Sequence, residues 1–173
     1  DAAPDRSPRP APASVSRGRA MTLSFTVYGV AQPQGSAKAF IPKGWNRAVI
    51  TSDNPKNKGW RQLVAEAASE AIRQMPAADR EVTTDAVRLT VAFHLPRPKY
   101  LKGKSAPHVT RPDCDKLVRS IFDSLTKVVW RDDSQVVELV ASKHYAAVDA
   151  VPGAVIRIEP VVTEAAERRL AFA

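Results

Sequence analysis

The chain has 173 residues, enough for one domain with a hydrophobic core. Its composition, 44% hydrophobic and 25% charged, is that of a globular protein, and no apolar run approaches the ~20 residues of a membrane helix. The formal net charge of +8 favours an anionic partner, most commonly nucleic acid, with a solvated lysine face as the alternative. The single cysteine, Cys114, excludes an internal disulfide, and no secretory signal is visible, so we expect a cytoplasmic protein.

The first 20 residues are rich in Pro, Ala, Ser and Arg and contain one bulky apolar residue, Val15. Such a segment buries too little surface to offset its ordering entropy, so we predict a disordered N-terminal extension over 1–20. We expect one folded domain over 21–163 and a weakly helical C-terminal tail over 164–173.

In the first half of the domain, the side chains of residues 23–30 form an alternating pattern, which predicts a strand. Turn residues and two short apolar runs follow, and they predict a loop and a hairpin with Gly44 near its turn. Residues 55–74 predict a helix bounded by Pro55 and Pro76. Its apolar positions recur at spacings of three and four: Trp60, Leu63, Val64, Ala67, Ala68 and Ile72.

In the second half, residues 85–96 predict a strand with one apolar face, formed by Val87, Leu89, Val91 and Phe93. A loop over 97–112 precedes a helix over 114–127, whose apolar stripe is Leu117, Val118, Ile121, Phe122 and Leu125. Residues 134–146 and 153–162 alternate as strands. This order predicts a single α+β (mixed α/β) domain in which a small mixed sheet packs against two main helices.

An acidic pair opens the second predicted helix after a long basic stretch. Between Asp85 and Asp113 there is no acid, and the cations there are Arg88, Arg97, Lys99, Lys102, Lys104 and Arg111. Helix capping needs one aspartate, so it explains Asp113 or Asp115 but not both. Residues two apart in an extended approach to a helix point to the same side, and two such carboxylates suit Mg²⁺. Capping and metal binding both remain open from this pattern.

A second acidic pair, Asp132 and Asp133, falls in the predicted turn before the next strand, where aspartate is favoured anyway. One of them could instead lie beside the start of the preceding helix, but the sheet would have to bring it there. Arg119 lies four residues after Asp115 on the same helical face. It is either an ion-pair partner of Asp115 or a cation directed at a phosphate.

The segments "RPDCDKLVRSIFDSL" and "WRDDSQV" together resemble the RusA family of Holliday junction resolvases. The family pattern is a basic loop, Pro-Asp-x-Asp-Asn-Leu-x-Lys, a helix ending Phe-Asp-x-Leu, and Asp-Asp-x-Gln-Val. The matching positions are Asp113, Asp115, Leu117, Phe122, Asp123, Leu125, Asp132, Asp133, Gln135 and Val136. The resemblance extends over about residues 23–160, with "HLPRPKYLKGK" as the basic loop.

Two positions depart from the family pattern. Lys116 stands where the family has Asn, and Arg119 stands where it has a Lys that it needs for cleavage. Arginine keeps the charge but is bulkier, planar and unable to lose its proton. This departure bears on catalytic efficiency more than on fold or metal binding.

The resemblance implies a homodimeric, Mg²⁺-dependent endodeoxyribonuclease that resolves four-way DNA junctions by paired nicks in recombination and repair. Its carried-over metal ligands are Asp113, Asp115 and Asp133, with Arg119 as a further catalytic residue. The basic residues expected to bind DNA are Arg97, Lys99, Lys102, Lys104, Arg111 and Lys116.

Two other functions fit parts of the sequence. A non-catalytic DNA-binding module would use the aspartates as caps and turns, and Mg²⁺-dependent nicking of a junction separates it from the nuclease. An aspartate-nucleophile phosphotransferase also uses Asp-x-Asp, but directly after an apolar strand, whereas here "HVTRP" precedes the motif. The remaining candidates are better explained by packing: Cys114 has no histidine near it in sequence, the three histidines lack metal-ligand spacing, and Trp60 and Trp130 are expected in the core.

Overall fold

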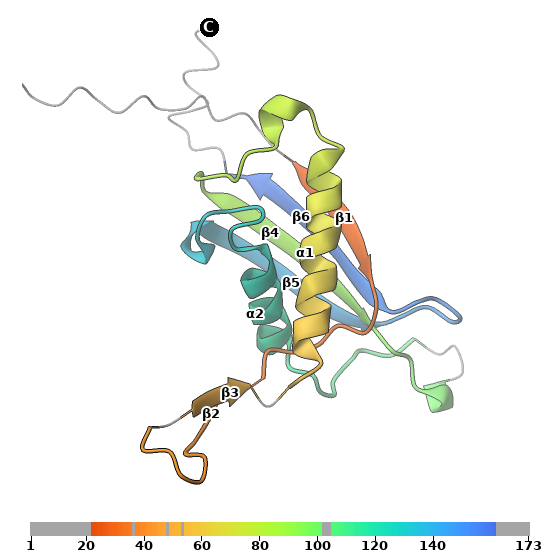
Figure 1. The fold of residues 1–173 in the computed structure, drawn as a ribbon. Coiled ribbons are helices and arrows are strands. Elements are labelled where there is room, and N and C mark those ends of the chain that lie inside the picture. Colours follow the sequence, from red (N-terminus) through yellow and green to blue (C-terminus); the bar gives the residue numbers. More distant parts are fainter. Residues whose placement is uncertain (1–21, 36, 48, 53, 102–104, 162–173) are drawn as a thin grey trace, which may run out of the picture.

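The computed structural model describes residues 22–35, 37–47, 49–52, 54–101 and 105–161 (Figure 1). The predicted extension over 1–20 and the predicted tail over 164–173 lie outside these residues, as do Lys102 and Lys104. Within the described residues, no helix is both long and apolar enough to cross a membrane.

Four strands form the main sheet, in the order β1-β6-β4-β5. They are β1 (Leu23–Tyr28), β6 (Gly153–Pro160), β4 (Val87–Leu95) and β5 (Val136–Tyr145). β6 pairs antiparallel with β1 and with β4, whereas β4 and β5 are parallel. A parallel pair needs a crossover connection, and α2 supplies it. The predicted mixed sheet is therefore confirmed.

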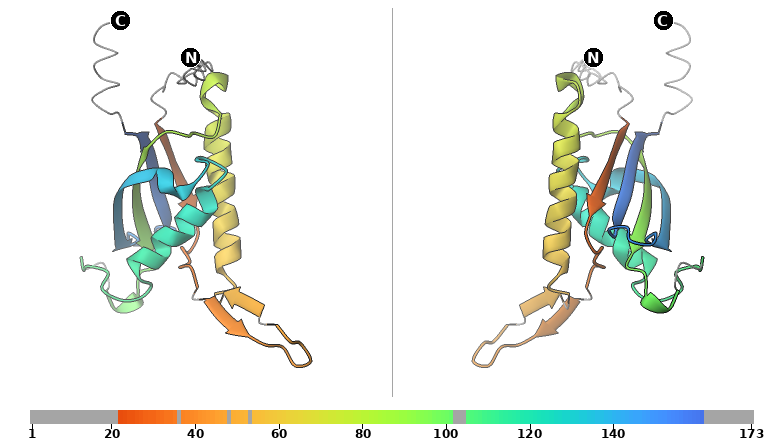
Figure 2. Two further views of the ribbon diagram at one scale, coloured as in Figure 1. Left: turned by 90° about the vertical axis from the view of Figure 1, so that its left-hand side faces the viewer. Right: turned by 90° about the vertical axis from the view of Figure 1, so that its right-hand side faces the viewer.

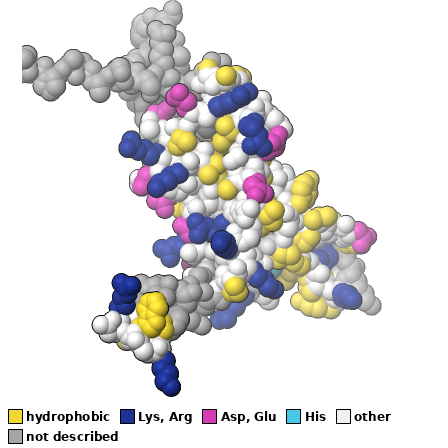
Figure 3. Space-filling model, in the orientation of Figure 1, with side chains coloured by type: hydrophobic (Ala, Val, Ile, Leu, Met, Phe, Trp, Pro, Cys, Tyr) yellow, Lys and Arg dark blue, Asp and Glu magenta, His cyan; other side chains and the backbone are white. Residues whose placement is uncertain are grey.

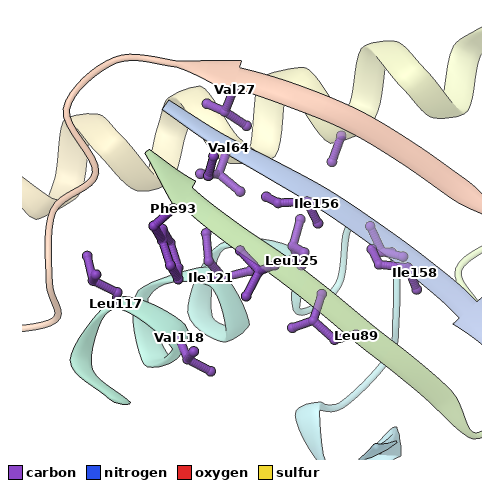
Figure 4. Packing of buried hydrophobic residues seen from close by; sticks show 14 of the residues in the cluster. Val27, Val64, Leu89, Phe93, Leu117, Val118, Ile121, Leu125, Ile156 and Ile158 are labelled. Atoms are coloured by element: carbon purple, nitrogen blue, oxygen red, sulfur yellow. The ribbon is translucent and has the colours of Figure 1, made fainter. Parts of the chain in front are cut away.

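Two helices cover one face of this sheet, and no helix of the described residues lies on the other face (Figure 2). They are α1 (Asn57–Arg73) and α2 (Cys114–Leu125). The predicted inward face of β4 is confirmed, since Val87, Leu89, Val91 and Phe93 are all buried. In Figure 4 two of them, Leu89 and Phe93, lie on the side of β4 that faces α2, and all four belong to one buried cluster with Leu117, Ile121 and Leu125 of α2. Burying each such side chain contributes about 1.5–3 kcal/mol, so this contact holds α2 against the sheet.

A two-stranded hairpin extends away from the sheet below α1 (Figures 1 and 2). It consists of β2 (Ala37–Phe40) and β3 (Val49–Ser52), which pair antiparallel. Gly44 lies in the connection with φ of 89°, a conformation that glycine adopts without strain. The predicted hairpin and its turn glycine are confirmed.

Among the described residues, three short 3₁₀ helices lie in the connections: η1 (Ala77–Asp79), η2 (Lys99–Leu101) and η3 (Asp133–Gln135). Because η3 occupies residues 133–135, β5 begins two residues later than the predicted strand. α2 ends at Leu125, two residues before the predicted end, and Lys127 has a left-handed φ of 67°. Trp60 and Trp130 are buried in the core as expected, whereas Leu63 lies on the flank of the α1 stripe and is exposed.

Candidate active site

The first turn of α2 places Asp113 and Asp115 in different backbone conformations. Asp113 is the N-cap residue in an extended conformation (φ −71°, ψ 140°), and Asp115 is already helical. The backbone carbonyl of Asp113 accepts a hydrogen bond from the Leu117 N–H at 3.2 Å, but its side chain makes no capping hydrogen bond. Its carboxylate is 3.9 Å from Lys116 Nζ, a loose and exposed ion pair that contributes little. Capping therefore does not explain the Asp113 side chain.

Two contacts from other elements hold the start of α2 in place. Lys143 of β5 donates hydrogen bonds from Nζ to the carbonyl oxygens of Thr110 at 2.8 Å and Pro112 at 2.9 Å. The backbone N–H of Gln34 donates to the Lys116 carbonyl at 2.8 Å. Lys143 was not predicted as a site residue. The feature that could have identified it is a charged residue at a position of an alternating strand where an apolar residue facing the core is expected.

The turn before β5 uses Asp132 for structure. Its Oδ1 accepts a hydrogen bond from the Ser134 N–H at 3.0 Å, and its own N–H donates to Gln135 Oε1 at 2.9 Å. These two bonds form a capping box at the start of η3. Hydrogen bonds from the Ser134 side chain and backbone lower the pKa of the Asp132 carboxyl. The turn explanation is therefore correct for Asp132.

Gln135 ties this turn to the segment that leads into β4. Its Nε2 donates to the carbonyl oxygens of Thr83 at 2.9 Å and Asp85 at 3.0 Å. With the bond from Asp132, one side chain thus joins three backbone groups and fixes where Asp133 lies. Sequence reasoning included Gln135 in the family match without a role.

A hollow of about 470 Å³ lies between α2 and β5, and we call it the acidic hollow. Its polar lining is Asp115, Arg119, Asp123 and Asp133, and Val118, Phe122, Leu139 and Ala141 are among its apolar lining. Three of the four predicted catalytic residues are therefore brought to one place from two separate elements. The third carboxylate of this lining, Asp123, was not predicted as a site residue. The alternative ion pair between Asp115 and Arg119 is absent from the described part of the chain.

Asp113 and Lys116 line a neighbouring hollow of about 660 Å³ on the other side of the start of α2. We call it the aromatic hollow, because Tyr100, His108 and Tyr145 also line it, together with Arg111. Asp113 and Asp115 diverge because the chain changes from extended to helical between them. The three predicted metal ligands thus face two adjoining hollows.

The donor set fits a metal ion that is only partly held by protein. In the described residues, no group of three or more His, Cys, Asp or Glu side chains is arranged to hold a metal ion. Mg²⁺ commonly uses one or two protein carboxylates and fills its other positions with waters and substrate phosphate oxygens. Asp115 and Asp133, which line one hollow, satisfy that requirement. The participation of Asp113 stays a prediction.

The described basic residues that were predicted to bind DNA line the aromatic hollow and one further hollow. Arg111 and Lys116 line the aromatic hollow, while Arg97 and Lys99 line a further hollow beside the β5–β6 turn. Arg97 also donates from Nε to the Ala146 carbonyl at 2.8 Å, so it helps to hold that turn. Figure 3 shows Lys and Arg over the lower part of the face, on the hairpin and near the start of α2, with few acids among them.

Comparison with known proteins identifies the class of protein to which this site belongs. Residues 31–159 match the family model for the endodeoxyribonuclease RusA. The chain therefore belongs to the RusA family of endodeoxyribonucleases, and this membership implies Holliday junction resolvase activity. It is also 33% identical over 134 residues to the uncharacterized protein YqaN of Bacillus subtilis (strain 168), covering 71% of this chain and 87% of YqaN.

Proposed function

We propose that this protein is a Mg²⁺-dependent, structure-specific endodeoxyribonuclease that resolves four-way DNA junctions by paired nicks during recombination and repair. One observation carries the proposal: Asp115, Arg119 and Asp133, from α2 and from the turn before β5, line a single hollow. The two aspartates stand at positions of the RusA pattern, and Arg119 stands where that pattern has a lysine. A set of caps and turns has no reason to converge in this way. The non-catalytic DNA-binding module is therefore the weaker alternative.

Each side chain of the acidic hollow has a distinct proposed role. Asp115 and Asp133 would hold Mg²⁺, with Asp113 beside them at the edge of the aromatic hollow. When bound, Mg²⁺ would supply Lewis-acid stabilisation of the negative charge that develops at the scissile phosphate. Arg119 would donate hydrogen bonds to the non-bridging phosphate oxygens, which guanidinium geometry suits. The apolar side chains of Val118 and Phe122 would limit water around these charges and so strengthen the interactions.

The proposed DNA contacts are the basic residues of the loop and of the start of α2. The support is the position of Arg111 and Lys116 beside Asp113, which would carry a phosphate backbone past the candidate active site. The single variants Lys99→Gln and Arg111→Gln should each lower the magnitude of the slope of log affinity against log salt concentration by about 0.9, the value for one lost phosphate contact. An unchanged slope in both variants would show that these cations are only solvated.

Paired nicks require two active sites, and we propose a homodimer that uses β5. This strand is at the edge of the main sheet, and its Val137 and Val140 are exposed. An edge strand with unpaired backbone groups and apolar side chains is a surface that a second copy can cover. Sedimentation velocity should find a dimer for the wild-type protein and a monomer for the double variant Val137→Lys, Val140→Lys. A monomeric wild-type protein would contradict the proposal.

The function is tested by nicking of a synthetic four-way junction beside a linear duplex of the same sequence. We expect symmetric nicks near the branch point in Mg²⁺, no nicks with a chelator, and no nicks in the linear duplex. Asp115→Asn should abolish nicking and keep junction binding, because it removes one charge without changing volume. Asp113→Asn in parallel shows whether the third predicted ligand takes part.

Asp149→Asn is the matched control for these substitutions. Asp149 is exposed in the β5–β6 turn with φ of 61°, a conformation that Asn tolerates as well as Asp. Junction binding without Mg²⁺-dependent nicking in the wild-type protein would favour the non-catalytic module instead.

A further inference from the structure

The aromatic hollow adjoins the candidate active site, and the proposed reaction leaves it without a role. The two hollows share the first turn of α2, with Asp113 and Lys116 on one side and Asp115 and Arg119 on the other. Its volume of about 660 Å³ is within the range of pockets that hold small ligands. A DNA strand whose phosphate lies over the first turn of α2 would place a neighbouring nucleotide at this hollow.

Two rings in contact, tilted against each other, form part of its lining. The ring centroids of His108 and Tyr145 are 4.4 Å apart with an interplanar angle of 39°. His108 is 7% exposed, and its Nδ1 has no hydrogen-bond partner in the described part of the chain. An unsatisfied buried nitrogen costs free energy that an apolar ring of similar size would avoid. A role for the ring in recognition would explain why histidine occupies this position.

A third ring lies exposed at the same hollow. Tyr100 of η2 is 72% exposed, so packing does not account for it. Arg111 and Lys116 bring positive charge to the lining, and Pro98 and Pro112 give it apolar walls. Aromatic faces for stacking beside cations for phosphate are the arrangement by which proteins hold unpaired nucleotides.

We propose that the aromatic hollow binds one unpaired nucleobase of the junction, adjacent to the scissile phosphate, and so contributes to the choice of cleavage position. The base stacks on the exposed Tyr100 ring and on the His108–Tyr145 pair, and Arg111 and Lys116 contact its phosphate. A base at a branch point has already lost part of its stacking, so taking it out of the duplex costs less there than within an arm. The inference rests on the proposed function, because it requires junction DNA at the start of α2.

The test is a double-mutant cycle between protein and DNA. Single-turnover nicking is measured for the wild-type protein and Tyr100→Ala, on an intact junction and on junctions with one abasic residue on either side of the scissile phosphate. Loss of one stacked base should slow the wild-type protein by roughly five- to 150-fold at one of the two positions. Tyr100→Ala should be slower on the intact junction, and the abasic residue should then cause little further loss, because both changes remove one interaction.

Tyr28→Ala is the matched control. Tyr28 is 68% exposed at the end of β1 and lines a different hollow, on the face of the sheet opposite α1 and α2. Tyr28→Ala therefore removes a ring of similar exposure from outside the aromatic hollow. It should keep the wild-type rate and the wild-type response to the abasic residue. A second variant, His108→Ala, should show the same coupling as Tyr100→Ala. Because His108 is buried, its thermal unfolding and junction affinity are measured alongside.

The outcomes separate the inference from the proposed function. If the wild-type protein nicks the intact junction but the effects of Tyr100→Ala and of the abasic residue multiply, the hollow does not hold that base and the inference is wrong. An equal rate on abasic and intact junctions has the same meaning. If the wild-type protein nicks no junction in Mg²⁺, the proposed function fails, and the inference fails with it.

Discussion

Asp132 and Asp133 are neighbours in one short turn, yet their carboxylates have different surroundings. Asp132 accepts a hydrogen bond from the Ser134 N–H and belongs to a capping box. Asp133 lines the acidic hollow with Asp115 and Arg119. The turn therefore uses one carboxylate to hold its own shape and presents the other to the hollow.

Asp113 and Asp115, the other acidic pair, are divided in a different way. Asp113 has the position of a helix cap without the side-chain hydrogen bond of one, and Asp115 lies in the first helical turn, where negative charge complements the helix dipole. The comparison teaches that position alone does not establish capping. Asp132 has the hydrogen bond that defines a cap, and Asp113 does not.

The largest expected effect separates the two aspartates of the turn. Asp133→Asn should reduce junction cleavage on the order of 10²–10³-fold or more, the scale for losing one preorganised charged group. Asp132→Asn should leave cleavage near the wild-type rate, because asparagine is as good a cap as aspartate. Single-turnover nicking of a four-way junction measures both. Equal losses in the two variants would mean that the division of roles between these carboxylates is wrong.

Arg119 sharpens the comparison within the acidic hollow, because it is the cation placed among its carboxylates. If its role is electrostatic, Arg119→Ala should slow cleavage on the order of 10²–10³-fold, and Arg119→Lys should keep most of the activity. Arg157→Ala, on the face of the sheet opposite α1 and α2, is the matched control and should cleave normally. If Arg119→Ala cleaves as fast as the wild-type protein, the phosphate contact is wrong. If Arg119→Lys instead cleaves much faster than the wild-type protein across pH, the residue at this position donates a proton to the leaving oxygen. Arginine performs that step poorly because it does not release its proton.

A smaller loss is expected from the residue that positions Asp133. Gln135→Ala removes the side-chain bonds to Asp132, Thr83 and Asp85. We expect the free energy of unfolding to fall by about 1–3 kcal/mol. Cleavage should fall by up to about 10²-fold, the scale for displacing a catalytic group by about 1 Å.

The control for Gln135 is Gln62→Ala on α1, whose side chain bonds only the neighbouring Glu66 among described residues. It should change neither stability nor cleavage measurably. If Gln135→Ala loses stability but cleaves at the wild-type rate, the turn holds Asp133 well enough without that side chain, and the positioning role is refuted.

Much of the fold could be predicted because its elements have strong periodicity. The alternation of β4 and the three- and four-residue spacing of α2 both reflect burial against one core, and burial is what the pattern records. The 3₁₀ turn η3 could not be predicted from periodicity, because three residues carry no period. Its attachment to the Thr83 segment through the Gln135 side chain spans more than fifty residues, which no local pattern records.

The candidate site was predictable in residue types and less so in arrangement. That Asp113 and Asp115 face different hollows follows from a change in backbone conformation between them, which residue spacing does not contain. Lys143 and His108 are positioned by contacts with residues more than thirty positions away in the sequence. Lys143 bonds the carbonyls of Thr110 and Pro112, and His108 contacts the ring of Tyr145. Such contacts exist only after the sheet has formed.

The smallest expected effect concerns the titration of Asp132. Hydrogen bonds from the Ser134 hydroxyl and then from its backbone N–H lower the pKa of the Asp132 carboxyl below its ordinary value. A carboxyl whose pKa is lower in the folded protein than in the unfolded chain stabilises the fold at a pH above its unfolded-chain pKa, and this contribution is lost as pH falls through its folded-state pKa.

Ser134→Ala removes the larger of the two causes and keeps the backbone bond, so the pKa of Asp132 should move part of the way back up. Carboxyl titration followed by NMR measures the shift in both proteins, and urea unfolding at descending pH should find Ser134→Ala losing its share of stability at a higher pH than wild type. An identical titration of Asp132 in the two proteins would show that the hydroxyl makes no such bond, and the structural role of Asp132 would then rest on its backbone contacts alone.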